Sequence, residues 1–124
     1  MNIQNLTTQS YGGNGGDAFP MTGIKSIQIY SGSYIDAIVI NGVKYGGDGG
    51  SPSATLNLAS DELIVAIDIR SGSYIDYLEF RTSKGIKISG GGGGGTLNSL
   101  QGSIVALGGR SGKYLDQLDI LGDF

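Results

Sequence analysis

The chain has 124 residues and a formal net charge of −3, and it contains 24 glycines but neither cysteine nor histidine. Disulfides and thiolate metal sites are therefore excluded, and the commonest general base and metal ligand is missing, so we expect neither a metal nor a cofactor. No cluster of Lys and Arg is present, which argues against nucleic acid or an anionic membrane as a partner. The length fits a single domain over residues 1–124.

Residues 1–5 contain no basic stretch followed by an apolar run, so they do not predict a signal peptide. No apolar run approaches the roughly 20 residues that a membrane-spanning helix needs, and we do not expect membrane insertion. A cytosolic protein, or one released without a signal peptide, fits these features. A mature secreted form with an added Met is the alternative.

From the N-terminus onward, the apolar segments are short, rich in Ile, Val, Leu and Tyr, and interrupted by glycine about every ten residues. Helix signals are nearly absent. This pattern is typical of an all-β protein with many short strands. We therefore predict an all-β fold.

A six-residue motif recurs with a fixed step along the chain. Ser-Gly-Ser-Tyr-Ile-Asp occupies residues 31–36 and again 71–76, and Ser-Gly-Lys-Tyr-Leu-Asp occupies residues 111–116. A repeat at a fixed step of 40 residues predicts repeated structural units that must be interpreted together. We expect three similar units.

The residues that follow each motif keep alternate positions apolar in all three copies, while the position between them also accepts acids. Such period-two patterning predicts a strand with one buried face. The apolar triplets are Ile38, Leu78 and Leu118, then Ile40, Phe80 and Ile120, and the intervening triplet is Val39, Glu79 and Asp119. Before the motifs, the matching triplets are Ile24, Ile64 and Ile104, then Ile27, Ile67 and Leu107.

Glycine runs form a second repeated element, at residues 12–16, 46–50 and 91–95. The second and third runs follow motifs one and two, but no glycine run follows motif three. The N-terminal segment, about residues 2–16, is therefore expected to complete the third unit. Three four-stranded sheets around a pseudo-threefold axis would then enclose a shared core. A single β-sandwich is the alternative, and it does not explain a threefold repeat.

The motif carries groups that suit a sugar. Aspartate accepts two hydrogen bonds, backbone amides in a turn donate, and tyrosine gives an apolar wall with a hydroxyl at its rim. A structural turn with a capping Asp and a packed Tyr is the alternative reading of any single copy. The run at residues 90–95 matches a nucleotide-binding glycine pattern only trivially, because no helix is expected after it.

Together, the three motifs and three glycine runs resemble those of the jacalin-related lectins, over essentially the whole chain. The resemblance rests on residues 31–38, 70–76 and 112–120 and on the glycine runs. It implies the β-prism I fold, with three four-stranded Greek-key sheets, and three metal-independent carbohydrate sites. Galactose-binding members are cut beside a site, whereas Gly16 lies inside an uncut chain, so the mannose/glucose type is implied.

The resemblance also implies which residues form each site: the motif aspartate and tyrosine, the residue before the tyrosine, and the last glycine of a glycine run. The three expected sets are Ser33, Tyr34, Asp36 and Gly50; Ser73, Tyr74, Asp76 and Gly95; and Lys113, Tyr114, Asp116 and Gly16. The expected partners are mannose-containing glycans and glycoproteins, bound through the terminal mannose of high-mannose chains.

Other interpretations remain open at this point. A glycosidase would need two acids across one cleft, whereas the motif aspartates fall in separate units, so we do not expect an enzyme. A β-prism module that binds a protein partner, with weak or no sugar binding, is the main alternative. Some family members dimerise by exchanging N-terminal strands; a homodimer here depends on the hinge at residues 16–20.

Overall fold

The computed structural model describes residues 5–124, which form twelve β-strands and no α-helix. The predicted all-β fold is confirmed. Within these residues, no helix has the length and apolar character needed to cross a membrane.

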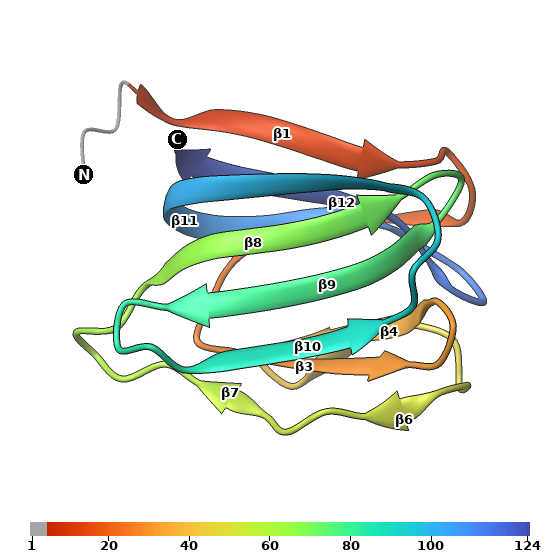
Figure 1. Ribbon diagram of the computed structural model, residues 1–124, viewed down its shortest axis with the longest axis horizontal. Helices are drawn as coiled ribbons and strands as arrows, with labels where there is room; N and C mark the ends of the chain where they lie inside the picture. Colours follow the sequence, from red (N-terminus) through yellow and green to blue (C-terminus); the bar gives the residue numbers. More distant parts are fainter. Residues whose placement is uncertain (1–4) are drawn as a thin grey trace.

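The strands fall into three units, each built from a central antiparallel hairpin with an edge strand on either side (Figure 1). Unit 1 consists of β3 (Ser26–Ser31), β4 (Ile35–Ile40), β5 (Val43–Gly46), β6 (Ser51–Pro52) and β7 (Leu56–Asn57). Unit 2 consists of β8 (Ile64–Ser71), β9 (Ile75–Thr82), β10 (Lys87–Gly91) and the first half of β11 (Thr96–Ser111). Unit 3 consists of the second half of β11, β12 (Leu115–Asp123), β1 (Thr7–Gly12) and β2 (Asp17–Gly23).

The N-terminal strands complete the third unit, as predicted. Strand β1 pairs with β12, with Thr7 opposite Gly122, and β2 pairs with the second half of β11, with Asp17 opposite Ser111. The segment that closes the unit extends beyond the predicted residues 2–16 to the end of β2, and residues 2–4 of that range lie outside the described part. Both ends of the chain therefore belong to one sheet (Figure 1).

Strand β11 belongs to two units, which the repeats did not predict. Its first half pairs with β8, from Thr96 opposite Ser71 to Ile104 opposite Ile64, and its second half pairs with β12. The register shifts between Gln101 and Ile104, around Gly102, whose φ of 152° suits glycine. Units 2 and 3 are therefore one continuous sheet that bends at this point.

In unit 1, the fourth strand is broken into β6 and β7. Pro52 has no N–H to donate to a strand ladder. The next residue compensates, because the Ser53 N–H donates to the Ile29 carbonyl at 2.7 Å and the Ser53 hydroxyl accepts the Ile29 N–H at 3.0 Å. One serine thus satisfies both backbone groups of its neighbour across the break.

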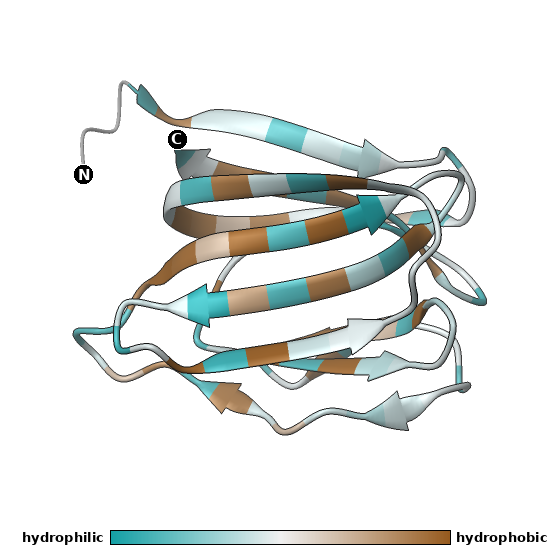
Figure 2. Ribbon diagram, in the orientation of Figure 1, coloured by the Kyte–Doolittle hydropathy of each residue, from teal (hydrophilic) through white to brown (hydrophobic). Residues whose placement is uncertain are grey.

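The three units bury their apolar faces in one shared core, and brown and teal alternate along the strands in Figure 2. The predicted triplets behave as expected: Ile38, Leu78 and Leu118 are fully buried, whereas Val39, Glu79 and Asp119 between them are partly exposed. Burying each such aliphatic side chain contributes about 1.5–3 kcal/mol. Ile24 differs from its counterparts Ile64 and Ile104, because it is only partly buried at the core's margin.

Phe80 is the largest of the fully buried side chains, so its truncation should leave a cavity in the shared core. We expect Phe80→Ala to lower the free energy of unfolding by about 3–5 kcal/mol, as measured by denaturant titration. Val43→Ala, at a 52% exposed position, is the control and should change it by less than about 0.5 kcal/mol. Equal effects of the two variants would contradict the assignment of the core.

Candidate functional site

The three motifs and the three glycine loops gather at one end of the molecule, on the right in Figure 1. Each motif is the turn of a central hairpin, between β3 and β4, β8 and β9, or β11 and β12. Each glycine loop, at residues 12–16, 46–50 and 91–95, joins the two edge strands of its own unit. The turn and the loop of a unit meet because neighbouring antiparallel strands place alternate ends on the same side.

Each motif aspartate lies against the last two glycines of the loop from its own unit. A Cβ added to Gly94 would lie 2.7 Å from Oδ2 of Asp76, and one added to Gly95 would lie 2.8 Å from its Oδ1. The other units repeat this arrangement: Gly49 and Gly50 lie against Asp36, and Gly15 and Gly16 lie against Asp116. The structure thus brings together the aspartate and the last glycine of each expected set. It adds the glycine just before the last one, at the fourth position of the loop.

The five positions of the loop have different steric demands, which explains the Gly-Gly-x-Gly-Gly pattern. The first glycine has a positive φ, 136° at Gly46, and lies against the carbonyl of the motif aspartate. The middle position is open, since a Cβ on Gly93 would meet nothing within 4 Å. That position therefore accepts Asn14 and Asp48 in the other loops.

The second glycine of each loop packs on the motif of a neighbouring unit. A Cβ on Gly47 would lie 2.1 Å from the carbonyl oxygen of Lys113, so only glycine fits there. Gly92 has the same relation to Ser33 of unit 1, and Gly13 to Ser73 of unit 2. The three loops and three motifs are therefore interlocked in a ring, which sequence reasoning missed. The doubled glycines were the available signal.

The three aspartates are largely buried, and their carboxylates accept no hydrogen bond from any group within residues 5–124. Asp36 is 9% exposed, and Asp76 and Asp116 are each 7% exposed. Burial raises the pKa of Asp76 and of Asp116 above the ordinary value, and nearby Arg70 and Arg110 partly oppose this effect. Among the described residues, no fully buried side-chain oxygen lacks a partner, so the oxygens of these carboxylates still reach solvent and are free to accept hydrogen bonds from a ligand.

Two arginines fasten the glycine loops of units 2 and 3. The Arg70 guanidinium donates to the Gly94 carbonyl at 3.0 Å and the Gly95 carbonyl at 3.2 Å. Arg110 repeats this contact in unit 3, with its Nη2 2.8 Å from the Gly16 oxygen. Sequence reasoning missed these residues as well, although they occupy the same position 40 residues apart.

Unit 1 holds its loop differently, because Tyr30 occupies the position of the two arginines. The Lys44 ammonium lies 4.3 Å from the centre of the Tyr30 ring and 3.9 Å from a carboxylate oxygen of Asp48, the middle residue of the loop. This surface contact is weaker than a two-donor guanidinium contact to backbone carbonyls. The three sites are consequently similar but not equivalent.

The three motif tyrosines meet at the centre of this end. The ring centres of Tyr34, Tyr74 and Tyr114 lie 5.3 to 6.0 Å from one another, at tilted or edge-to-face angles. Tyr34 and Tyr74 are exposed, at 41% and 38%. The Lys113 ammonium lies 6.0 Å from the centre of the Tyr114 ring. The tyrosines therefore form one aromatic platform shared by all three units.

Ser33, Ser73 and Lys113 lie in the turns with their carbonyls under a neighbouring glycine loop. The turn itself is closed by the preceding glycine, since the Gly32 N–H donates to the Tyr34 carbonyl at 3.0 Å, as in the other two copies. A Cβ on Gly32 or Gly72 would contact no atom within 4 Å. Glycine at this position thus leaves the surface beside the motif clear.

This fold and this repeated site define a class of protein. The sequence pattern of the jacalin-like lectin domain matches residues 8–121, and the chain belongs to that family. The fold is the β-prism of jacalin-related lectins.

Griffithsin from Griffithsia sp. is 44% identical to the chain over 80 residues, which is 64% of each protein, so the match spans less than two thirds of griffithsin. Wild-type Malaysian banana lectin is 27% identical, with a TM-score of 0.77 over 94% of this chain and 97% of that one. A mannose-binding jacalin-related lectin from Ananas comosus is also 27% identical, with a TM-score of 0.78 over 97% and 99% of the two chains.

The steric reading of the glycine loop predicts different effects for two adjacent substitutions. Gly94→Ala should push the Asp76 carboxylate outward, so that it gains solvent and its pKa falls towards the ordinary value. Gly93→Ala, at the open position, is the matched control and should leave that pKa unchanged. The carboxyl carbon shifts of Asp76 in an NMR pH titration measure both; identical titrations in the two variants would contradict the reading.

Proposed function

We propose that this chain is a metal-independent lectin that binds the terminal mannose of high-mannose glycans at three sites. The observation that carries the proposal is the threefold repetition of a largely buried carboxylate that faces bare glycine backbone and has no hydrogen bond from the described residues. Each site pairs a motif with a glycine loop; the residues are Ser33, Tyr34, Asp36 and Gly50; Ser73, Tyr74, Asp76 and Gly95; and Lys113, Tyr114, Asp116 and Gly16.

The chemistry of each site matches two adjacent hydroxyls of a pyranose. The carboxylate accepts one hydrogen bond on each oxygen, and charge-assisted bonds of this kind are the stronger sort. Motif amides donate in return, and the tyrosine rings cover the apolar face of the sugar. The similar lectin from Ananas comosus is named as a mannose-binding jacalin-related lectin, which supports mannose as the sugar.

A single site should bind weakly, because a monosaccharide replaces water molecules that form hydrogen bonds of similar strength. A dissociation constant near 1 mM corresponds to about 4 kcal/mol. Branched glycans that reach two sites gain by effective concentration, by about 10²-fold where the geometry permits. The natural partners in this proposal are therefore glycans and glycoproteins with several terminal mannoses.

Each polypeptide is proposed to act as a single domain that builds its third site from its own two ends. Pairing of β1 with β12 and of β2 with β11 in one chain supports this. Exchange of β1 and β2 between two chains would build the same site in a homodimer, and light scattering in solution distinguishes the two states.

We also propose that the sites bind sugars without cleaving them. A glycosidase places two carboxyl groups about 5–9.5 Å apart across the scissile bond. Here each carboxylate faces two glycines of its own loop, and the three belong to separate units. Chromogenic mannosides should remain intact on prolonged incubation with the protein.

Replacing the three carboxylates together should abolish binding but preserve the fold. We expect the triple variant Asp36→Ala, Asp76→Ala, Asp116→Ala to show no heat with methyl α-mannoside in calorimetry, and each single variant to lose one of three sites. Asp61→Ala is the control, because Asp61 is an exposed acid whose carboxylate lies 2.7 Å from the Lys84 ammonium, outside the three motifs and loops. A triple variant that still binds mannosides would show the site assignment to be wrong.

If the wild-type protein binds no sugar on a glycan array, the protein-binding alternative replaces this proposal. That outcome is separate from failure of the triple variant, since it concerns the ligand and not the residues.

Acid should weaken binding in units 2 and 3 at a higher pH than expected for ordinary aspartates. The pKa of Asp76 and of Asp116 is raised by burial, so protonation removes the two-acceptor carboxylate as the pH falls through those raised values. Stability moves the other way: a carboxyl with a higher pKa folded than unfolded stabilises the fold as it becomes protonated. As the pH falls through this range, calorimetry should show a falling affinity for the sugar. Denaturant titration should show that protonation of Asp76 and Asp116 does not lower the free energy of unfolding.

A further inference from the structure

A hollow of about 470 Å³ lies on the outer face of unit 2, directly behind the glycine loop that faces Asp76. Its size falls within the range of about 300–1,000 Å³ typical of small-molecule sites. It is lined by Asp68, Arg70, Tyr77, Leu97 and the loop residues Gly91, Gly92 and Gly93. None of the four side chains belongs to the proposed sugar-binding sets, although Arg70 also holds the loop of the Asp76 site.

The lining combines groups that recognise a sugar ring. Tyr77 offers an aromatic ring, and Leu97, 51% exposed, offers an apolar surface. Asp68 supplies carboxylate oxygens for hydroxyls, and the Arg70 side chain reaches from the hollow to the carbonyls of Gly94 and Gly95. An apolar wall with a few polar groups fits a neutral hexopyranose better than a charged ligand.

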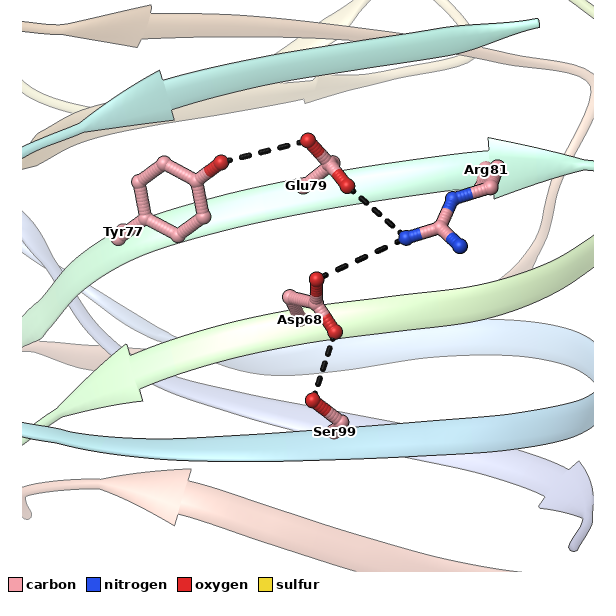
Figure 3. A network of polar contacts seen from close by, with 5 residues as sticks. All are labelled: Asp68, Tyr77, Glu79, Arg81 and Ser99. Carbon is pink, nitrogen blue, oxygen red and sulfur yellow. Dashed lines mark hydrogen bonds and ion pairs between the residues drawn. The ribbon is translucent and has the colours of Figure 1, made fainter.

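A polar network holds Asp68 and Tyr77 in place (Figure 3). The Ser99 hydroxyl donates to Oδ1 of Asp68 at 2.7 Å, and Nη2 of Arg81 lies 3.7 Å from Oδ2 of Asp68 and 3.0 Å from Oε2 of Glu79. Glu79 in turn accepts the Tyr77 hydroxyl at 3.4 Å. Walls that are fixed before binding reduce the entropy lost when a ligand binds.

Only unit 2 carries this set of side chains. In the strand register, unit 3 has Gly108, Arg110, Gln117 and Ala18 at the corresponding positions, and unit 1 has Gln28, Tyr30, Ala37 and Pro52. The carboxylate and the leucine are therefore missing from both other units, and neither has an aromatic ring at the position of Tyr77, although unit 1 has Tyr30 at the position of Arg70. Unit 3 is a natural control, because it keeps the arginine that fastens the loop.

The hollow and the Asp76 site share one loop. Asp76 and Tyr77 are consecutive in β9 and point to opposite faces of the sheet, with Asp76 buried and Tyr77 towards the outer face. The wall between the Asp76 carboxylate and the hollow is the glycine loop, residues 91–95, which carries no side chain. A bound sugar at Asp76 can thus continue over a thin, side-chain-free wall into the hollow.

We propose that the hollow is a second subsite, which binds the next hexose of an α-linked oligosaccharide whose terminal mannose occupies the Asp76 site. The inference rests on the proposed function of Asp76. It makes unit 2 a site for two linked sugars, whereas units 1 and 3 bind one.

Two single-site proteins test the proposal by calorimetry. The first keeps unit 2 (Asp36→Ala, Asp116→Ala), and the second keeps unit 3 (Asp36→Ala, Asp76→Ala). The probes are methyl α-mannoside and the α1,2-, α1,3- and α1,6-linked mannobioses. We expect the unit 2 protein to bind at least one mannobiose about tenfold more tightly than the monosaccharide, and the unit 3 protein to bind them with similar affinity.

Substitutions that copy unit 3 into unit 2 complete the test. In the unit 2 protein, Tyr77→Gln with Leu97→Ala should remove the mannobiose advantage and leave the affinity for methyl α-mannoside unchanged. That retained affinity also shows that the variant is folded. Loss of affinity for both sugars together would mean that these residues only support the Asp76 site, and would overturn the subsite.

The failure of the inference differs from failure of the proposed function. Equal affinities for monosaccharide and all mannobioses in the unit 2 protein overturn the second subsite alone. Absence of binding to methyl α-mannoside by both single-site proteins overturns the function on which it rests.

Discussion

The close approach of bare glycine backbone to the motif turns is the constraint on which the rest of this end of the molecule depends. Gly47 lies where any Cβ would strike the Lys113 carbonyl, and Gly50 lies where a Cβ would strike the Asp36 carboxylate. One loop therefore touches two units at once. The same relation runs round all three units, so each loop is in direct backbone contact with a neighbouring motif and the three sites share one scaffold.

The core beneath supplies the rigidity that such close contacts need. By strand alternation, Asp36 faces the same side of β4 as Ile38 and Ile40, which are buried in the shared core. The carboxylate is thus the last inward-facing group of a packed strand, held at the rim where the core ends. At the equivalent places in units 2 and 3, burial raises the pKa of Asp76 and of Asp116. In all three units the carboxylate can accept hydrogen bonds from a ligand.

Pseudo-threefold symmetry of the backbone does not make the three sites alike. Arg70 and Arg110 fasten two of the loops through backbone carbonyls, while Tyr30 and Lys44 take over in unit 1. The outer face of unit 2 carries Tyr77, where unit 3 has Gln117. Repeats preserve the contacts that the fold requires, and the positions that face solvent are free to give each site its own surroundings.

The sequence by itself determined the all-β class, the three units, the alternating core positions such as Ile38 and Phe80, and the closure of the third unit by the N-terminal segment. These follow from the periodicity of each strand and from the repeat, which can both be recognised along the sequence without knowing which residues meet in space. Only the tertiary structure decided that β11 serves two units, that Gly47 packs on the Lys113 carbonyl, and that a hollow lies behind the loop at residues 91–95 of unit 2. Those features join residues from different units, and no pattern along one strand records which backbone will lie a few ångströms away.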